Sequence, residues 1–308
     1  MSAVRAGDPV VAILCSDIHL TLKPPIARSD EPDWRAAMQR PLDQISNLQE
    51  VHNAPVICAG DLFDRWNAPA ELINFALTRL PEILAIPGQH DLPLHRLDLI
   101  ERSAFTSLVL ADRIRMLGSH KRIRVNQWLD VWGFPYGEPI QPLREEIPGH
   151  YQVAVIHQYL WTPGHSHPKA QRSSSLFSNR KSLQGYDLVV AGDNHQAWEE
   201  ELDDGPVVYN CGSLLRRRAD EIEHKPRVGV LYASGHLQSF LLDISEDHIA
   251  DTREILTESK EDPELSDFID SLLDLSKSKF DFRDSMEEVL DRLDAHPLVR
   301  AAILEAME

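Results

Sequence analysis

Cysteine is scarce in this chain of 308 residues, which has only Cys15, Cys58 and Cys211. No pair has the Cys-x-x-Cys spacing of zinc sites, and the first two lie in apolar runs, so we expect reduced, buried thiols. Long apolar runs are also missing: no stretch approaches the roughly 20 residues that cross a bilayer, and the N-terminal residues lack the apolar core of a signal peptide. We find no internal repeat and no low-complexity segment. These absences favour a cytoplasmic globular protein without membrane association.

Negative charge is abundant but uneven. The formal net charge is −18, and residues 245–308 carry 19 acidic and 7 basic side chains, so that only −6 remains for the first 244 residues. The acidity therefore belongs mainly to the C-terminal segment and says little about a substrate. The length suffices for one large domain and a small appendage. We predict a catalytic domain over residues 1–243 and an acidic helical segment over residues 244–308.

Short β-branched runs without polar alternation predict strands that are buried on both faces. Five of these runs cover residues 9–14, 55–58, 83–86, 153–156 and 188–190. Further strands are predicted more closely together, at residues 123–125, 128–134, 207–209, 227–232 and 237–242. Strands that first alternate with helices and then follow one another predict an α/β fold of two stacked sheets flanked by helices.

Apolar residues at helical spacing predict the helices of this fold. One helix is expected around residues 42–51 with Pro41 in its first turn, and another over residues 72–80, capped by Asn67. Apolar spacing between residues 268 and 304 predicts small amphipathic helices in the acidic C-terminal segment.

Aspartate and histidine recur directly after the predicted strands. The motifs are, in chain order, Asp17-Ile18-His19, Gly60-Asp61, Gly88-Gln89-His90-Asp91, His157 and Gly192-Asp193-Asn194-His195. Ligands of α/β sheets bind beyond the carboxyl ends of the strands, so the five loops should converge on one crevice. Carboxylate oxygens and imidazole nitrogens are ligands of divalent first-row metals. The sequence therefore predicts a metal centre.

These five motifs, in this order, resemble the calcineurin-like metallophosphoesterase superfamily, whose pattern is DxH, GD, GNH(D/E), H and GHxH. The resemblance covers about residues 9–243 and implies two mixed sheets with outer helices, two divalent metal ions and hydrolysis of phosphoesters. Within the superfamily, residues 60–65 (GDLFDR) and 208–214 (VYNCGSL) are similar to SbcD-type DNA-repair nucleases and their phage recombination relatives.

The resemblance implies a role for each motif residue. Asp17, His19 and His195 would bind one metal, Asp61 would bridge, and Gln89, His157 and Asp193 would bind the second. A hydroxide held by the two cations would be the nucleophile. His90 would stand near the scissile phosphate as an acid, with Asp91 either orienting it or serving as a polar loop residue.

Two positions depart from the family pattern, and both fall on the second metal. Gln89 replaces an asparagine and Asp193 replaces a histidine, which makes this site richer in oxygen. Oxygen ligands favour Mn²⁺, our first expectation, or Mg²⁺, with Fe²⁺ as a further candidate. The alternative is a second site that binds weakly or not at all.

The sequence gives fewer signals for the substrate and the partners than for the metal centre. Arg216, Arg217 and Arg218 follow the Gly212-Ser213 turn and are candidates for phosphate contacts, unless they form a solvated face. The nuclease branch implies DNA as the substrate and a coiled-coil SbcC-type ATPase subunit as a partner; we also consider a homodimer. Our leading hypothesis is a Mn²⁺-dependent DNA nuclease of recombination or repair. The alternatives are a phosphatase or phosphodiesterase that acts on a small molecule or phosphoprotein, and a catalytically weakened scaffold that binds DNA or a partner.

Overall fold

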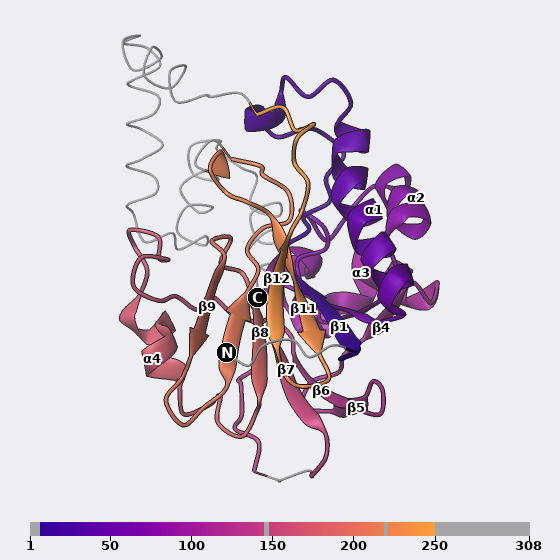
Figure 1. Ribbon diagram of the computed structural model, residues 1–308. Helices are drawn as coiled ribbons and strands as arrows, with labels where there is room; N and C mark the ends of the chain where they lie inside the picture. Colours follow the sequence, from indigo (N-terminus) through magenta and orange to yellow (C-terminus); the bar gives the residue numbers. More distant parts are fainter. Residues whose placement is uncertain (1–6, 145–147, 219–220, 250–308) are drawn as a thin grey trace, which may run out of the picture. The chain divides into compact units, whose positions relative to one another are not determined.

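Two six-stranded sheets form the centre of the computed structural model, which describes residues 7–144, 148–218 and 221–249 (Figure 1). The first sheet consists, in spatial order, of β12 (Leu237–Leu241), β11 (Arg227–Tyr232), β1 (Val10–Cys15), β2 (Val56–Cys58), β3 (Ile83–Ala85) and β4 (Ile114–Met116). The second consists of β5 (Arg122–Arg124), β6 (Leu129–Phe134), β7 (Tyr151–His157), β8 (Leu188–Gly192), β10 (Val207–Asn210) and β9 (Trp198–Glu201). The predicted α/β fold is thereby confirmed.

Both sheets are mixed. In the first, β1 to β4 are parallel, whereas β11 pairs antiparallel with both β1 and β12. In the second, β6, β7, β8 and β10 are parallel, and the outer strands β5 and β9 are antiparallel. The carboxyl ends of the parallel strands therefore lie at one edge of each sheet, where the polar motifs follow them.

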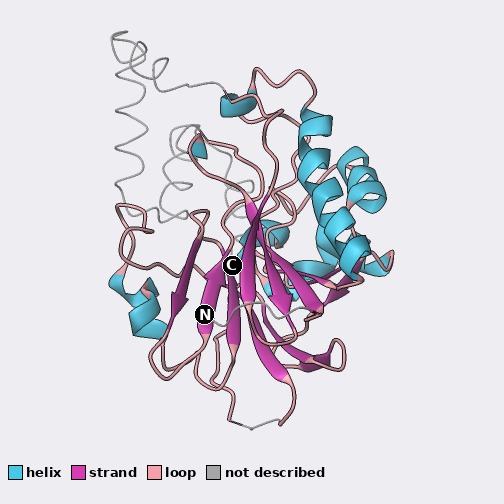
Figure 2. Ribbon diagram, viewed as in Figure 1, coloured by secondary structure: helices cyan, strands magenta, loops and turns pink. Residues whose placement is uncertain are grey.

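The longer helices lie together on one side of the strands (Figure 2). The α-helices are α1 (Trp34–His52), α2 (Ala70–Arg79), α3 (Ala104–Leu110) and α4 (Leu176–Asn179). The 3₁₀ helices are η1 (Ile26–Arg28), η2 (Gln89–Asp91), η3 (Pro93–His95), η4 (Leu97–Arg102) and η5 (Arg172–Ser174). In the described residues, no helix combines the length and the apolar character that a membrane span requires.

Two predicted helix starts are wrong. Helix α1 begins at Trp34, because Asp33 caps it by accepting a hydrogen bond from the backbone N–H of Ala36, and Pro41 lies inside the helix. The long apolar face, which continues on both sides of Pro41, outweighs the one backbone hydrogen bond that a proline cannot donate. Helix α2 begins at Ala70 after Pro69, without a side-chain cap from Asn67.

Alternate residues of the buried strands pack into different apolar layers. In β1, Ile13 and Cys15 face the cluster beneath α1 to α3, whereas Ala12 and Leu14 face the layer between the sheets. Strand β7 also contributes to this inner layer, and its other face packs against the segment that contains α4. This burial on both faces fixes the strand ends that carry the polar motifs. The predicted helices between residues 268 and 304 lie outside the described residues.

Candidate metal centre

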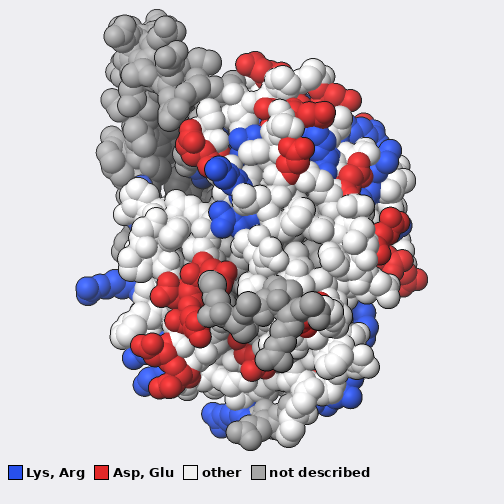
Figure 3. Space-filling model, viewed as in Figure 1, with Lys and Arg blue, Asp and Glu red and all other residues white. Residues whose placement is uncertain are grey.

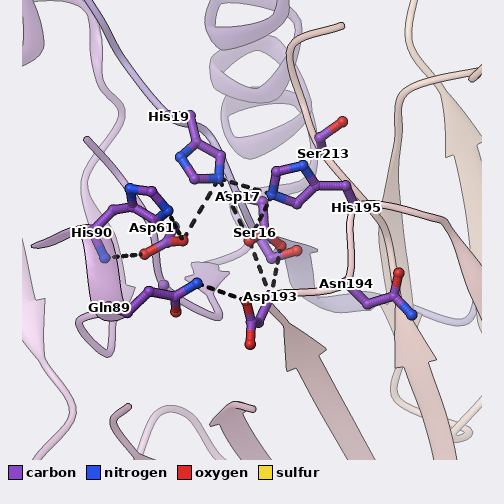
Figure 4. A network of polar contacts seen from close by, with 12 residues as sticks. Ser16, Asp17, His19, Asp61, Gln89, His90, Asp193, Asn194, His195 and Ser213 are labelled. Carbon is purple, nitrogen blue, oxygen red and sulfur yellow. Dashed lines mark hydrogen bonds and ion pairs between the residues drawn. The ribbon is translucent and has the colours of Figure 1, made fainter. Parts of the chain in front are cut away.

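The loops that follow β1, β2, β3 and β8 supply most side chains of the site (Figure 4), and His157, the last residue of β7, completes it. Backbone hydrogen bonds continue the pairing of β1 and β2 into these loops, from Asp17 N–H to the Gly60 carbonyl at 3.0 Å and from His19 N–H to the Asp61 carbonyl at 2.9 Å. The loops are thus extensions of the sheet, so their side chains have fixed positions.

Four motif residues have left-handed backbone conformations. The φ angles are 51° for both Asp17 and His19, 53° for Asp61 and 79° for Asp193. Such conformations are uncommon for residues with a Cβ and concentrate at functional sites. Here the strained turns point carboxylate and imidazole groups from successive loops toward one centre.

Asp17, His19 and His195 form the first cluster. The Nε2 atoms of His19 and His195 lie 3.1 Å apart. Asp17 Oδ1 lies 3.9 Å from His19 Nε2 and 4.0 Å from His195 Nε2. Asp17 and His19 are buried, whereas the side chain of His195 is 31% exposed. Burial raises the pKa of Asp17 to about 6 and lowers the pKa of His19 well below its usual value. The lowered pKa keeps His19 neutral, as a metal ligand must be.

Asp61 lies between this cluster and His157. Its Oδ2 atom is 3.6 Å from His19 Nε2 and 3.4 Å from His157 Nε2. Burial alone would raise the pKa of Asp61, but His157, His19 and His90 together lower it well below its usual range. The carboxylate is therefore ionised and faces both groups of histidines, which is the position that a bridging ligand requires.

His157 presents one ring nitrogen to the centre. Its Nδ1 atom lies 2.5 Å from the Ala59 carbonyl, which can only accept a hydrogen bond, so Nδ1 carries a proton and Nε2 faces Asp61. Burial alone would lower the pKa of His157, but Asp61 and Asp17 raise it well above its usual value, so a cation bound at Nε2 would replace a proton there. No room remains behind this ring, because a Cβ on Gly60 would lie 2.3 Å from Nδ1. The glycine of the Gly60-Asp61 motif is thus needed for the position of His157.

Buried atoms without hydrogen-bond partners test whether cations fit here. Among the described residues, His157 Nε2, Asp61 Oδ2 and Gln89 Oε1 are buried and accept no hydrogen bond. Unpaired buried polar atoms are costly and rare, so three that belong to adjacent candidate ligands call for a charged group to satisfy them. A divalent cation fits this set of donors.

Gln89 and Asp193, the two departures from the family pattern, contact one another. Gln89 Nε2 donates a 2.6 Å hydrogen bond to Asp193 Oδ1, which leaves Gln89 Oε1 as the free amide oxygen. The backbone N–H of Asp193 donates to Asp17 Oδ1 at 3.1 Å. Asp17, Asp61 and His157 form the second cluster, and Gln89 and Asp193 lie beside it. Asp193 does not itself belong to any group of three side chains that could share one ion among the described residues.

His90 stands at the rim of the site, where its side chain is 40% exposed. Its backbone N–H donates to Asp61 Oδ1 at 2.9 Å, and its Nδ1 lies 2.9 Å from the Asp64 carbonyl. Because that carbonyl only accepts, Nδ1 holds a proton and Nε2 is left to face the centre, 4.0 Å from Asp61 Oδ2. The ring is therefore oriented by a backbone group.

Of the two alternatives for Asp91, its contacts favour the loop residue over the partner of His90. Its buried carboxylate accepts the backbone N–H groups of Leu62, Phe63 and Gly88, at 3.2, 3.0 and 3.0 Å. These bonds join the loop after β2 to the loop after β3, and the group that orients the His90 ring is the Asp64 carbonyl. Burial raises the pKa of Asp91 to about 7. Asp91 holds the two loops together.

The three consecutive arginines are in different environments. Arg216 is 7% exposed and its guanidinium binds Asp247 at 3.0 Å, so it is turned away from any substrate. The guanidinium of Arg217 pairs with the Asp64 carboxylate, beside His90. Arg218 is exposed and lines the cavity that adjoins His195. The structure therefore places two of the three near the site.

Glu221 is a site residue that the motifs did not reveal. Its Oε1 lies 3.3 Å from His195 Nδ1, and its Oε2 accepts the backbone N–H groups of Arg217 and Arg218 at 2.7 and 3.2 Å. Burial would raise the pKa of Glu221, but these hydrogen bonds and His195 lower it, so the carboxylate is ionised. A carboxylate behind a histidine ligand fixes the ring and its tautomer. No strand or periodic pattern precedes Glu221, so only the tertiary contact identifies it.

Two solved structures and one family model are similar to this chain. The chain is similar to protein TT1561 of Thermus thermophilus, with 13% identity and a TM-score of 0.44 over 76% of this chain and all of that one. It is similar to the sulfate thiohydrolase SoxB of Thermus thermophilus, with 12% identity and a TM-score of 0.44 over 85% of this chain and 61% of that one. No curated protein matches the sequence. The family model described as calcineurin-like phosphoesterase matches residues 11–197. The chain belongs to the calcineurin-like phosphoesterase family.

Proposed function

We propose that the protein is a metal-dependent phosphodiesterase whose substrate is DNA, a nuclease of the recombination or repair type. The observation that carries the proposal is the position of Asp61 Oδ2, 3.6 Å from His19 Nε2 and 3.4 Å from His157 Nε2, between two sets of buried ligands. When bound at such a pair of sites, two divalent ions activate water and clamp the oxygens of an in-line phosphoryl displacement.

The ligand sets follow from the clusters. The first would comprise Asp17, His19, His195 and Asp61, and the second would comprise Asp61, His157, Gln89 and Asp193. The second set has three oxygen-bearing side chains and one histidine, which favours Mn²⁺ or Mg²⁺ over softer metals. If Asp193 is a ligand, Asp193→Ala should weaken Mn²⁺ binding at the second site. Unchanged Mn²⁺ binding would show that Asp193 is not one of the ligands.

His90 has the geometry of a proton donor to the leaving oxygen. Its Nδ1–H is held by the Asp64 carbonyl at 2.9 Å, so the ring stays in place while Nε2 exchanges a proton near the bridging carboxylate. Its 40% exposure leaves room for a substrate to approach. The role of His90 is thus acid catalysis at the rim, and that of Asp64 is to position it.

Arg217 supports a phosphodiester substrate. Its guanidinium is half-buried beside Asp64, and its charge adds to burial and to His195 in lowering the pKa of His19, so Arg217 lies close enough to act on the first cluster. An arginine there can bind a phosphate oxygen that is not held by a cation. The GDLFDR stretch, which contains Asp64, is also the segment that is similar to SbcD-type nucleases.

Other parts of the surface limit where DNA would lie. On the face in Figure 3, acidic side chains gather over β9, where Glu199, Glu200 and Glu201 are exposed. Basic side chains line the cavity beside His195, among them Lys169, Arg218 and Lys225, although Glu221 and Glu223 line it as well. A phosphate backbone would therefore follow this cavity. A coiled-coil ATPase partner stays a prediction, because residues 250–308 lie outside the described residues.

The test is Mn²⁺-dependent cleavage of end-labelled linear DNA beside a chromogenic phosphodiester. We expect cleavage of both, and a loss of at least about 100-fold in kcat for Asp61→Asn and His90→Asn. His52→Asn, at the exposed end of α1, is the matched control. Cleavage of the small ester alone would reassign the protein to small-molecule phosphodiesterases. Mn²⁺ binding without turnover of either substrate would make it a scaffold.

A further inference from the structure

A cavity of about 460 Å³ opens beside the second cluster and has no role in the chemistry described above. His157 and Asp193 form its boundary with the metal centre, and Tyr136, Gln158 and Tyr159 line its other walls. These residues follow the neighbouring parallel strands β6 and β7, so they lie at the same sheet edge as the metal centre. The volume is within the range of small-ligand sites, which is roughly 300–1,000 Å³.

The two tyrosine rings are held in place by the surrounding structure. The Tyr136 ring lies edge to face with the His157 ring, with 6.4 Å between the two centroids. The backbone N–H of Tyr136 donates a hydrogen bond to the Pro87 carbonyl at 3.2 Å. The Tyr159 hydroxyl accepts a 3.0 Å hydrogen bond from the His167 N–H, and the Tyr159 and His167 rings lie 5.0 Å apart. Fixed, half-buried aromatic rings are suitable platforms for a planar ligand.

The charge of this cavity disfavours a second phosphate as its occupant. No Lys or Arg from the described chain lines it, whereas Asp193 and Glu138 do. The larger cavity of about 1070 Å³, which shares Tyr159 and Asp193 with this one, is lined by four basic side chains, Lys169, Arg218, Lys225 and Arg227, and also by Glu221 and Glu223. Phosphates are therefore favoured in the basic cavity, and an uncharged aromatic group is favoured between the tyrosines.

Gln158 supplies a polar group for such a ligand. It is half-buried in the cavity wall, and its amide has no hydrogen-bond partner in the part of the chain that the structure describes. An amide offers both a donor and an acceptor, the combination that pairs with the edge of a nucleobase. Glu138, by contrast, is already paired with His120, at 3.2 Å.

We propose that this cavity binds the nucleobase next to the scissile phosphate, with Tyr136 and Tyr159 as stacking surfaces and Gln158 at the base edge. The inference rests on the proposed function and narrows it to substrates that carry a nucleoside at the cleaved bond. Stacking tolerates every base, so the site selects a nucleoside over an alkyl group rather than one sequence over another.

Equilibrium binding tests the proposal without requiring turnover. The affinities of the Mn²⁺-loaded protein for thymidine 5′-monophosphate, thymidine 3′-monophosphate and methyl phosphate are compared by calorimetry, so that methyl phosphate reports the metal centre alone. We expect at least one nucleotide to bind about tenfold more tightly than methyl phosphate. The preferred isomer would show on which side of the phosphate the base lies.

Variants assign the preference to the cavity. Tyr136→Leu and Tyr159→Leu should each lower the ratio of nucleotide to methyl phosphate affinity several-fold, whereas Tyr136→Phe and Tyr159→Phe, which keep the ring, should preserve it. Tyr232→Leu, on β11 and away from the cavity, is the control for loss of a tyrosine. Equal wild-type affinity for all three ligands, or a ratio that is unchanged by both leucine variants, would overturn the proposal. Absent turnover with an intact ratio would overturn the nuclease function alone.

Discussion

Replacing Glu221 by glutamine tests whether this carboxylate sets the affinity of the first metal site. Glutamine keeps the size of the side chain but has one acceptor oxygen where Glu221 uses two. In the wild type, Oε1 faces His195 Nδ1 at 3.3 Å, while Oε2 accepts two backbone N–H groups at 2.7 and 3.2 Å. In Glu221→Gln an amide NH₂ must face one of these donors, so either the imidazole or the loop loses its partner.

The magnitude follows from the role of such contacts. Removal of the group that orients a histidine ligand typically costs 10–100-fold in metal affinity, so we expect a loss of about 1.4–2.8 kcal/mol in binding free energy. The loss should be confined to the first site, because Glu221 contacts His195, whereas the outer nitrogen of His157 in the second site is held by the Ala59 carbonyl.

The assay is a calorimetric titration of the metal-free protein with Mn²⁺, fitted with two sites. Glu223→Gln is the matched control, since it removes one negative charge from an exposed side chain two residues away. Thermal unfolding of the metal-free variants separates ligand positioning from a general loss of stability. Equal Mn²⁺ affinities for Glu221→Gln and Glu223→Gln would refute the assigned role.

Three further predictions concern the second site, the metals and the core. Gly60→Ala, at φ +98° and with a Cβ 2.3 Å from His157 Nδ1, should weaken the second site more than the first in the same titration. Removing metal with EDTA should lower the melting temperature of the wild type, because buried ligand atoms lose their partner; an identical melting temperature would contradict a resident metal. Glu31→Gln should lower the free energy of unfolding, measured by urea denaturation, by about 3 kcal/mol, because the Glu31 carboxylate is buried 2.6 Å from the Arg28 guanidinium. Glu71→Gln, whose ion pair with Arg35 is exposed, should cost under about 1 kcal/mol.

The Glu31 contact also predicts how stability depends on pH. Burial raises the pKa of Glu31, but hydrogen bonds from Arg28, from the His248 N–H and from Arg40 outweigh it, so the pKa in the folded state lies below the usual value. The stabilisation is therefore complete above the pKa of about 4.3 in the unfolded chain and is lost as pH falls through the lower folded value. Glu31→Gln should thus have an acid unfolding transition that is shallower than that of the wild type.

The two sheets with their flanking helices and the order of the site loops could be predicted from the sequence, because both depend on local patterns. Buried strands have continuous apolar runs, and the polar residues directly after them must lie at the sheet edge. By this reasoning Asp17, Asp61 and His157 were expected to be neighbours, and the structure brings them within reach of one ion. Pro41 shows the limit of local signals: its position inside α1 depends on the tertiary burial of Met38 and Leu42 on either side.

The residues that support the motif side chains could not be predicted, because their contacts join segments that are distant in the sequence. Arg216 looked like its two neighbours, but Asp247, which lies 31 residues away, binds its guanidinium and holds it in the interior. The same Asp247 contacts Arg28 and Arg40, so three arginines from distant parts of the sequence meet at one carboxylate.

Asp64, Arg217 and Glu221 connect His90 to His195. The Asp64 carbonyl holds His90, its carboxylate pairs with Arg217, and the backbone N–H of Arg217 binds the carboxylate that also holds His195. A displacement at either end would therefore be transmitted to the other through groups that never touch a metal. These contacts hold His90 and His195 in place without Gln89 or Asp193, the two departures from the family pattern. We therefore predict that Asp64→Asn, which weakens the pairing with Arg217, changes both kcat and the Mn²⁺ affinity of the first site. If His90 and His195 were positioned independently of one another, the substitution would change only one of these two quantities.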